Sequence, residues 1–309
     1  MTEKAYLQPL WVSARLTATA AALAAAFPAY GEEDEDIAML TRPQSTVEAG
    51  VGAVSDDNLR FGQYSGLHEE GAYLLLDADI NLRDDPSGTW LRLRGRNLGL
   101  ESRELRFENE RQGDWAYFVD FSQIPRFSPY IVNTTLAGIE TGSQVEGGVP
   151  ARDVRLETRR DALGLGVSKK LGGGWDASVR FKHEQKTGTR LFGHHAVRFL
   201  VDPIDYRTEQ FEATVGFTGK RLQLSGGYYG TNFQNDNPFV AVTGPGLTPI
   251  ALPPGNQSHQ LFLSGGYGFT PTTRGMFKVA LGRITQEEAF FTPPIASVPR
   301  DNLGGRIDT

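Results

Sequence analysis

Nearly all of the chain after residue 44 alternates between apolar and polar side chains with a period of two residues. Because successive side chains of a β-strand point to opposite faces, this alternation predicts strands that separate two different environments. Several strands exceed the five or six residues usual in globular proteins and match the roughly 9–11 residues that cross a bilayer obliquely. The predicted strands cover residues 44–54, 70–82, 89–98, 103–112, 114–123, 152–168, 174–190, 205–218, 220–235, 257–269 and 272–288, and another begins at "LGGRIDT".

The connections between these strands alternate in length along the chain. The short turns are "DDPSG", "RQGD", "KKLGGG", "TGKR" and "TPTT". The longer connections are 55–69, 124–151, 191–204, 236–256 and 289–302, and the tight "LGLES" is the exception. Short periplasmic turns and longer extracellular loops are typical of outer-membrane barrels. We therefore predict an all-β fold, an antiparallel up-and-down transmembrane β-barrel meander over residues 44–309, with a periplasmic N-terminus.

The number of strands does not complete a barrel. Eleven complete strands leave unpaired edges, and unpaired backbone groups cannot face lipid. The chain also lacks the C-terminal aromatic residue typical of barrel assembly signals. We therefore expect about 11–12 strands in an open or incomplete barrel, and an N-terminal fragment of a longer gene product.

One face of the predicted strands is apolar and is expected to contact lipid, with aromatic residues near the strand ends as at a membrane interface. The alternative is a soluble all-β protein whose apolar face is its core. The apolar face comprises Leu74, Leu76, Ala78 and Ile80; Leu91 and Leu93; Trp115, Tyr117, Val119 and Phe121; Leu163, Leu165 and Val167; Trp175, Ala177, Val179 and Phe181; Phe211, Ala213, Val215 and Phe217; Leu222, Leu224 and Tyr228; Leu261, Leu263, Tyr267 and Phe269; and Phe277, Val279 and Leu281.

The other face carries charges, most densely in "TWLRLRGRNL", where three arginines alternate with apolar or small residues. We expect this face to line a wet lumen, because an arginine facing lipid at mid-depth costs about 2–4 kcal/mol. The expected lumen-facing charged wall consists of Asp77, Asp79, Arg92, Arg94, Arg96, Glu104, Arg106, Glu108 and Glu110.

The turns suggest how these charges meet across neighbouring strands. A hairpin through Asp85-Pro86 places Asp79 opposite Arg92 and Asp77 opposite Arg94. The next hairpin places Arg96 opposite Glu104, Arg92 opposite Glu108, and Arg94 opposite Arg106. Directly opposed Cβ atoms lie about 5 Å apart, which allows ion pairs. The Arg94–Arg106 pair needs an acidic neighbour or water.

Much of the polar face elsewhere carries only small side chains: Ala162, Gly164 and Gly166; Ser178; Ser225 and Gly227; Ser264, Gly266 and Gly268; Ala280 and Gly282. A narrow barrel fills its interior with side chains. We therefore expect a wide barrel that contains water or another body.

The composition restricts the chemistry of the chain itself. It has no cysteine, which excludes disulfides, cysteine-based zinc sites, Fe–S clusters and covalently attached c-type haem. Its net charge of −6 gives no reason to expect nucleic-acid binding. No Ser or Asp nucleophile with a positioned His is evident, so we do not expect an enzyme. The adjacent His194 and His195 are more readily explained as solvated loop residues than as metal ligands.

The N-terminus has the pattern of an export signal. Lys4 and Arg15 flank a weak n-region, and "LTATAAALAAAFPA" is an apolar run of the expected length. We expect residues 1–31 to be a signal peptide cleaved after Gly31, and 32–43 to be a short periplasmic segment. A short amphipathic or buried helix is the alternative for the apolar run.

The block "TWLRLRGRNLGLESRELRFENERQGDWAYFVDFSQIPRF" and the later "DNLGGRIDT" closely resemble the MtrB/PioB family. These are outer-membrane barrels of Gram-negative cells associated with multihaem c-type cytochromes. The resemblance implies a barrel that sheathes such a cytochrome for electron transfer across the outer membrane. The haem belongs to the partner, and contact with an extracellular cytochrome is a further implied possibility. A CxxC motif found in some members is absent here.

Two other functions remain open at this point. A porin-like diffusion or substrate channel also needs a barrel, and residues 124–151 are long enough to fold inward and narrow its pore. A secreted soluble β-protein, such as an adhesin, is the third possibility. The small-residue wall and the family blocks favour the sheath.

Overall fold

The computed structural model of the protein describes residues 44–195, 198–243, 249–286 and 305–308. The expected signal peptide, its cleavage after Gly31 and the segment 32–43 lie outside the described residues. Within the described part of the chain, no helix has the length and apolarity needed to cross a membrane.

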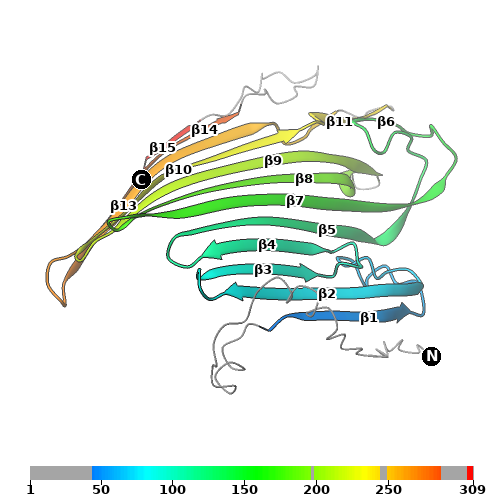
Figure 1. The fold of residues 1–309 in the computed structure, drawn as a ribbon. Helices are drawn as coiled ribbons and strands as arrows, with labels where there is room; N and C mark the ends of the chain where they lie inside the picture. Colours follow the sequence, from blue (N-terminus) through cyan, green and yellow to red (C-terminus); the bar gives the residue numbers. More distant parts are fainter. Residues whose placement is uncertain (1–43, 196–197, 244–248, 287–304, 309) are drawn as a thin grey trace.

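The described residues are organised almost entirely as β-strands (Figure 1). The strands are β1 (Thr46–Val54), β2 (Gly71–Asp84), β3 (Thr89–Arg96), β4 (Glu104–Arg111), β5 (Trp115–Thr134), β6 (Ser143–Val145), β7 (Arg152–Gly172), β8 (Trp175–His195), β9 (Arg198–Thr218), β10 (Leu222–Asn235), β11 (Phe239–Thr243), β12 (Ile250–Ala251), β13 (Asn256–Gly268), β14 (Arg274–Gln286) and β15 (Gly305–Asp308).

Twelve of these strands form one sheet in the order β1-β2-β3-β4-β5-β7-β8-β9-β10-β13-β14-β15. Every neighbouring pair is antiparallel, and β1 and β15 are the two edges of the described sheet. Figure 1 shows that this sheet is curved and open. The predicted antiparallel meander of about 11–12 strands in an incomplete barrel is therefore confirmed.

Some strands continue well beyond their predicted ends. The expected loop 191–204 is wrong for most of its length. Strands β8 and β9 pair with each other through this segment, with Thr189 opposite Pro203 and Leu191 opposite Val201. Likewise β5 runs through Pro125, which pairs with Arg159. Proline lacks an N–H and suits a strand that has only one hydrogen-bonded neighbour. Pro125 of β5 and Pro203 of β9 both lie where only one neighbouring strand is paired. The pairing of β5 with β4 ends at Ser122, and the pairing of β9 with β10 ends at Tyr206.

Two of the predicted loops, 124–151 and 236–256, meet at the end of the sheet. Their short strands form a second sheet, in the order β12-β11-β6, in which β6 and β11 are parallel. We call this second sheet and its connections the end cap. It has a small buried core in which Leu136, Leu200, Val240, Val242 and Leu252 pack together. The fully buried amide of Gln144 donates to the Val201 carbonyl at 2.5 Å and ties the end cap to β9.

The large sheet itself keeps its apolar face exposed. The register aligns apolar residues in rows, as in Tyr117↔Val167↔Val179 and Tyr228↔Leu261↔Leu281. A soluble sandwich would bury these side chains in a shared core. Instead Leu163, Val179 and Val215 are 41%, 38% and 47% exposed. The exposed apolar rows are those expected of a lipid-facing surface, and the alternative in which the apolar face is a buried core is wrong.

Two glycines of the polar face on β7 are covered by neighbouring side chains, so the wall is less bare than the sequence predicts. A Cβ at Gly166 would overlap the ring of Phe118, and one at Gly164 would overlap the Asp120 carboxylate. Arg106 lies over the same Phe118 ring at 4.3 Å from its centroid. On this part of the wall, the glycines make room for large side chains of β5.

Replacing Gly166 with Ala is expected to lower the free energy of unfolding by about 1–3 kcal/mol, because the Phe118 ring must leave its place beneath Arg106. The matched control is Gly266→Ala, where the nearest atom to an added Cβ lies at 3.6 Å. The free energy of unfolding of both variants is measured in urea, with the gel mobility of the folded form in detergent as the signal. Equal stability of the two variants would contradict the covered position of Gly166.

Candidate functional site

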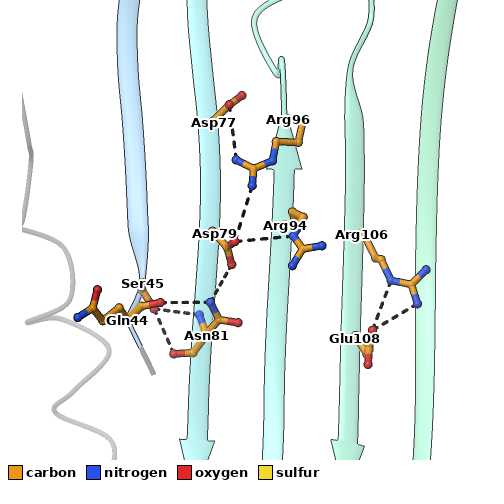
Figure 2. Close-up of polar contacts among 9 residues, drawn as sticks. All are labelled: Gln44, Ser45, Asp77, Asp79, Asn81, Arg94, Arg96, Arg106 and Glu108. Carbon is orange, nitrogen blue, oxygen red and sulfur yellow. Dashed lines mark hydrogen bonds and ion pairs between the residues drawn. The ribbon is translucent and has the colours of Figure 1, made fainter. Parts of the chain in front are cut away.

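The charged wall lies on adjacent strands β2 to β5, and its arginine row alternates along β3 (Figure 2). The predicted pairing of β3 with β4 is confirmed: Arg96 lies opposite Glu104, Arg92 opposite Glu108, and Arg94 opposite Arg106. These three pairs share one face because directly opposed residues in an antiparallel ladder point to the same side.

The predicted pairing of β2 with β3 is wrong by two residues. Asp79 lies opposite Arg94, not Arg92, and the residue opposite Arg92 is Asn81. The turn is a four-residue loop between Asp84 and Thr89, with Gly88 in the left-handed region at φ 64°. The centre of the hairpin therefore lies beyond Asp85-Pro86, and each carboxylate of β2 moves one position along the arginine row.

Each arginine of β3 contacts carboxylates on a flanking strand. Arg94 lies 3.7 Å from Asp79, and Arg96 bridges Asp77 at 3.6 Å and Asp79 at 3.8 Å. Asp79 also accepts a 2.7 Å hydrogen bond from Asn81 (Figure 2). Arg94 and Arg96 thus neutralise Asp77 and Asp79, and Asp79 is the carboxylate on which both of them converge.

The far side of the row is anchored to β4. Arg92 lies 3.3 Å from Glu108 and 3.1 Å from Glu110. Glu104 was expected to pair with Arg96, but Arg96 reaches across to β2 instead. Register alone therefore identifies which residues are opposite one another, whereas the direction of a long guanidinium decides which ion pair forms.

The unfavourable pair Arg94–Arg106 is resolved by acidic neighbours, as the sequence requires. Arg106 contacts Glu108 at 3.3 Å and Asp120 at 3.9 Å. Its guanidinium also lies over Phe118, and a cation above an aromatic face is attracted by the ring's quadrupole. The two guanidiniums are therefore held by separate partners on opposite sides of the row.

Sequence reasoning missed three members of this wall. Trp90 lies between two guanidiniums, with Arg83 at 5.1 Å and Arg92 at 5.0 Å from its ring. Asp120 and Phe118 were not assigned to the wall, although they alternate with the apolar residues of β5. The period of two that placed Arg92 on this face places Trp90 there as well, so the signal was present in the sequence.

The same face is hollowed farther along the sheet, over β8, β9, β10, β13 and β14. The hollow has a volume of about 780 Å³. Its lining on the polar face consists of Asp176, Gly216, Gln223, Ser225, Ser264, Gly266, Arg274, Met276 and Lys278. The glycines and serines among these residues leave part of the polar face open here, beside longer charged side chains.

The histidines with described contacts outside the wall do not form a catalytic arrangement with it. His183 lies 3.6 Å from Glu209, and His259 Nδ1 lies 2.6 Å from the Tyr228 hydroxyl. Both belong to the opposite, apolar face, because His183 is opposite Leu163 and Tyr228 is opposite Leu261. His68 lies just before β2 and is buried against Phe127. The chemistry of the wall is therefore that of charge pairing and solvation.

We expect Asp79→Ala to cost about 1 kcal/mol more unfolding free energy than Glu104→Ala, because Asp79 holds two guanidiniums and Asn81. Glu104 is the matched control, because Arg96 contacts Asp77 and Asp79 in place of Glu104. Urea unfolding at low and high salt checks this. The difference should shrink in high salt, because exposed ion pairs are screened; a salt-independent difference would contradict the explanation.

Comparison with known proteins places the chain among outer-membrane proteins. Residues 53–309 match the model of the outer membrane beta-barrel porin family MtrB/PioB. The chain is 25% identical over 297 residues to outer membrane protein MtrB of Shewanella baltica (strain OS185), covering 87% of this chain and 42% of that protein. The chain thus spans less than half the length of this relative.

Among solved structures, OmpT expressed in the outer membrane of Vibrio cholerae aligns with a TM-score of 0.40 at 12% identity, covering 86% of this chain and 77% of OmpT. In-vitro folded OmpT aligns with a TM-score of 0.38, covering 86% and 76%.

Proposed function

The chain belongs to the MtrB/PioB family of outer membrane β-barrel porins, and on that premise we propose that it forms part of a sheath around a multihaem c-type cytochrome. The sheath would let the cytochrome carry electrons across the outer membrane. The haems of the partner supply the redox chemistry, and this chain supplies the wall that separates them from lipid.

The observation that carries this proposal is the hollow of about 780 Å³ on the polar face. Glycines and serines form part of its lining, beside charged residues such as Asp176, Arg274 and Lys278, and the opposite face of the same strands exposes apolar rows. A lumen wall that must admit a folded protein needs such open space, whereas a wall facing only itself fills with side chains. The polar face is therefore assigned to the lumen and the apolar face to lipid.

The charged wall has a structural part in this proposal. Arg92, Arg94 and Arg96 are all held by carboxylates of the wall itself. Their contribution is to keep the lumen side polar over β2 to β5, while individual exposed pairs stabilise by only about 0–1 kcal/mol. Contact of these arginines with haem propionates or acidic groups of the cytochrome would require exchange of partners.

A porin-like diffusion channel is the second candidate, favoured by the description of the family and by the open hollow. Porins commonly narrow the pore with an inward loop, and residues 124–151 are long enough to do so. In the structure this segment joins the end cap through the pairing of β6 with β11. The sheath is therefore the better-supported function.

A substitution inside the hollow distinguishes the two functions. Ser264→Trp places a large ring in the hollow and is expected to reduce the haem that co-purifies with the protein by about tenfold, because the ring takes the cytochrome's space. The matched control is Leu263→Trp at the preceding residue of β13, which lies on the exposed apolar face, where an aromatic residue is compatible with lipid.

Haem absorbance of the affinity-purified protein from the native host measures the result, and ion conductance in planar bilayers measures the alternative. Absence of haem from the unsubstituted protein together with an open conductance would establish the porin function instead. Equal loss of haem in both variants would show a folding defect, whereas unchanged haem in Ser264→Trp would remove the hollow from the proposed contact.

The proposed topology is tested with single cysteines, because the chain has none of its own. We place the N-terminus and the turns that follow β2, β4, β7, β9 and β13 in the periplasm. The end cap, on which an extracellular cytochrome could dock, would then lie outside the cell. Cysteine at exposed Glu140 should react with a membrane-impermeant maleimide on intact cells, and cysteine at exposed Lys220 should react only after lysis. The reverse pattern would invert the topology.

A further inference from the structure

A basic pair lies on the apolar face of the sheet, just beyond its last apolar row. His259 of β13 lies directly opposite Arg283 of β14. The next pair on the same face toward the short turn is Leu261↔Leu281, whose side chains are 60% and 50% exposed. The pair therefore marks the place on these two strands where an apolar surface gives way to positive charge.

The orientation of the histidine is fixed from one side. The Tyr228 hydroxyl and His259 Nδ1 lie 2.6 Å apart, and the two rings are stacked at 6.0 Å. This contact occupies one ring nitrogen and leaves Nε2 as the group available to an external ligand. Opposed residues have Cβ atoms about 5 Å apart, so Nε2 and the guanidinium can reach one small anion together.

Three other basic residues on this face have carboxylate partners. Arg159 lies 3.1 Å from Asp161, His183 lies 3.6 Å from Glu209, and Arg207 lies 2.8 Å from Asp236. Within the described residues, neither His259 nor Arg283 has a carboxylate within ion-pair distance. The register partner of Arg283 on β15 is Arg306, and Asp308 lies opposite Leu281. The register of the described strands therefore places no carboxylate directly opposite either member of the pair.

We propose that His259 and Arg283 bind a phosphate group of lipid A, the phosphorylated lipid of the outer leaflet. The acyl chains would lie on the exposed apolar side chains of Leu261, Leu263, Val279 and Leu281, and the phosphate would meet the basic pair where that surface ends. Guanidinium groups pair with phosphate through two parallel hydrogen bonds. The outer leaflet follows from the position of the pair, near the ends of β13 and β14 that join the long connections. The inference rests on the face assignment and topology proposed above and is independent of the cytochrome.

Lipid binding is measured by native mass spectrometry of the protein purified from its own outer membrane and titrated with bisphosphorylated lipid A. Arg283→Gln is expected to weaken binding about tenfold, which is the loss of one charge-assisted hydrogen bond to phosphate. His259→Gln should weaken it in the same direction, and Arg283→Lys should retain part of the affinity because it keeps the charge. Dephosphorylated lipid A should bind all forms equally weakly.

The matched control is Arg159→Gln, which removes an arginine from the same face whose partner is Asp161. Its lipid A affinity should equal that of the unsubstituted protein. The proposal is overturned if Arg283→Gln binds lipid A as tightly as the unsubstituted protein, or if Arg159→Gln weakens binding equally. Haem co-purification should be unchanged in Arg283→Gln, so failure here is separable from failure of the proposed sheath function.

Discussion

The structure depends on a backbone hydrogen-bond ladder that keeps one face apolar and the other polar across twelve strands. In lipid every backbone N–H and C=O must be satisfied by a neighbouring strand. A slip of one residue would exchange the two faces of a strand and bring Arg92, Arg94 and Arg96 to the apolar side. The long, regular registers, such as that of β8 with β9, satisfy both demands together.

The same physics explains how much the sequence could predict. The order of the strands and the side chains that share one face of the sheet both follow from the period of two in the sequence. The described strands agree with both predictions. The β2–β3 register could not be predicted, because a shift of two residues leaves every side chain on its original face. The hydrophobic pattern is equally good with Asp79 opposite Arg92 or Arg94, and the loop conformation at Gly88 decides between them. The candidate wall was therefore recognised as a set, but its individual partners were not.

The strand extensions and the end cap were beyond prediction for a different reason. They depend on contacts between segments far apart in sequence. Gln144 reads as a polar loop residue, yet it is fully buried and bonded to the backbone of Val201. Asp202 is also fully buried and is paired with Arg190 at 2.7 Å. Nothing local in 124–151 or 236–256 indicates which distant residues these segments contact, because short polar segments acquire order only from what they pack against.

The parallel pairing of β6 with β11 also sets an order of events during assembly. Ser143 pairs with Ala241, and β7, β8, β9 and β10 all lie between them in the chain. Contacts of such high sequence separation form late, because the entropy of closing the intervening loop must first be reduced by other contacts. We therefore expect the pairing of β6 with β11 to form only after the four intervening strands have paired. Protease resistance at this end of the molecule is therefore expected to appear late in folding.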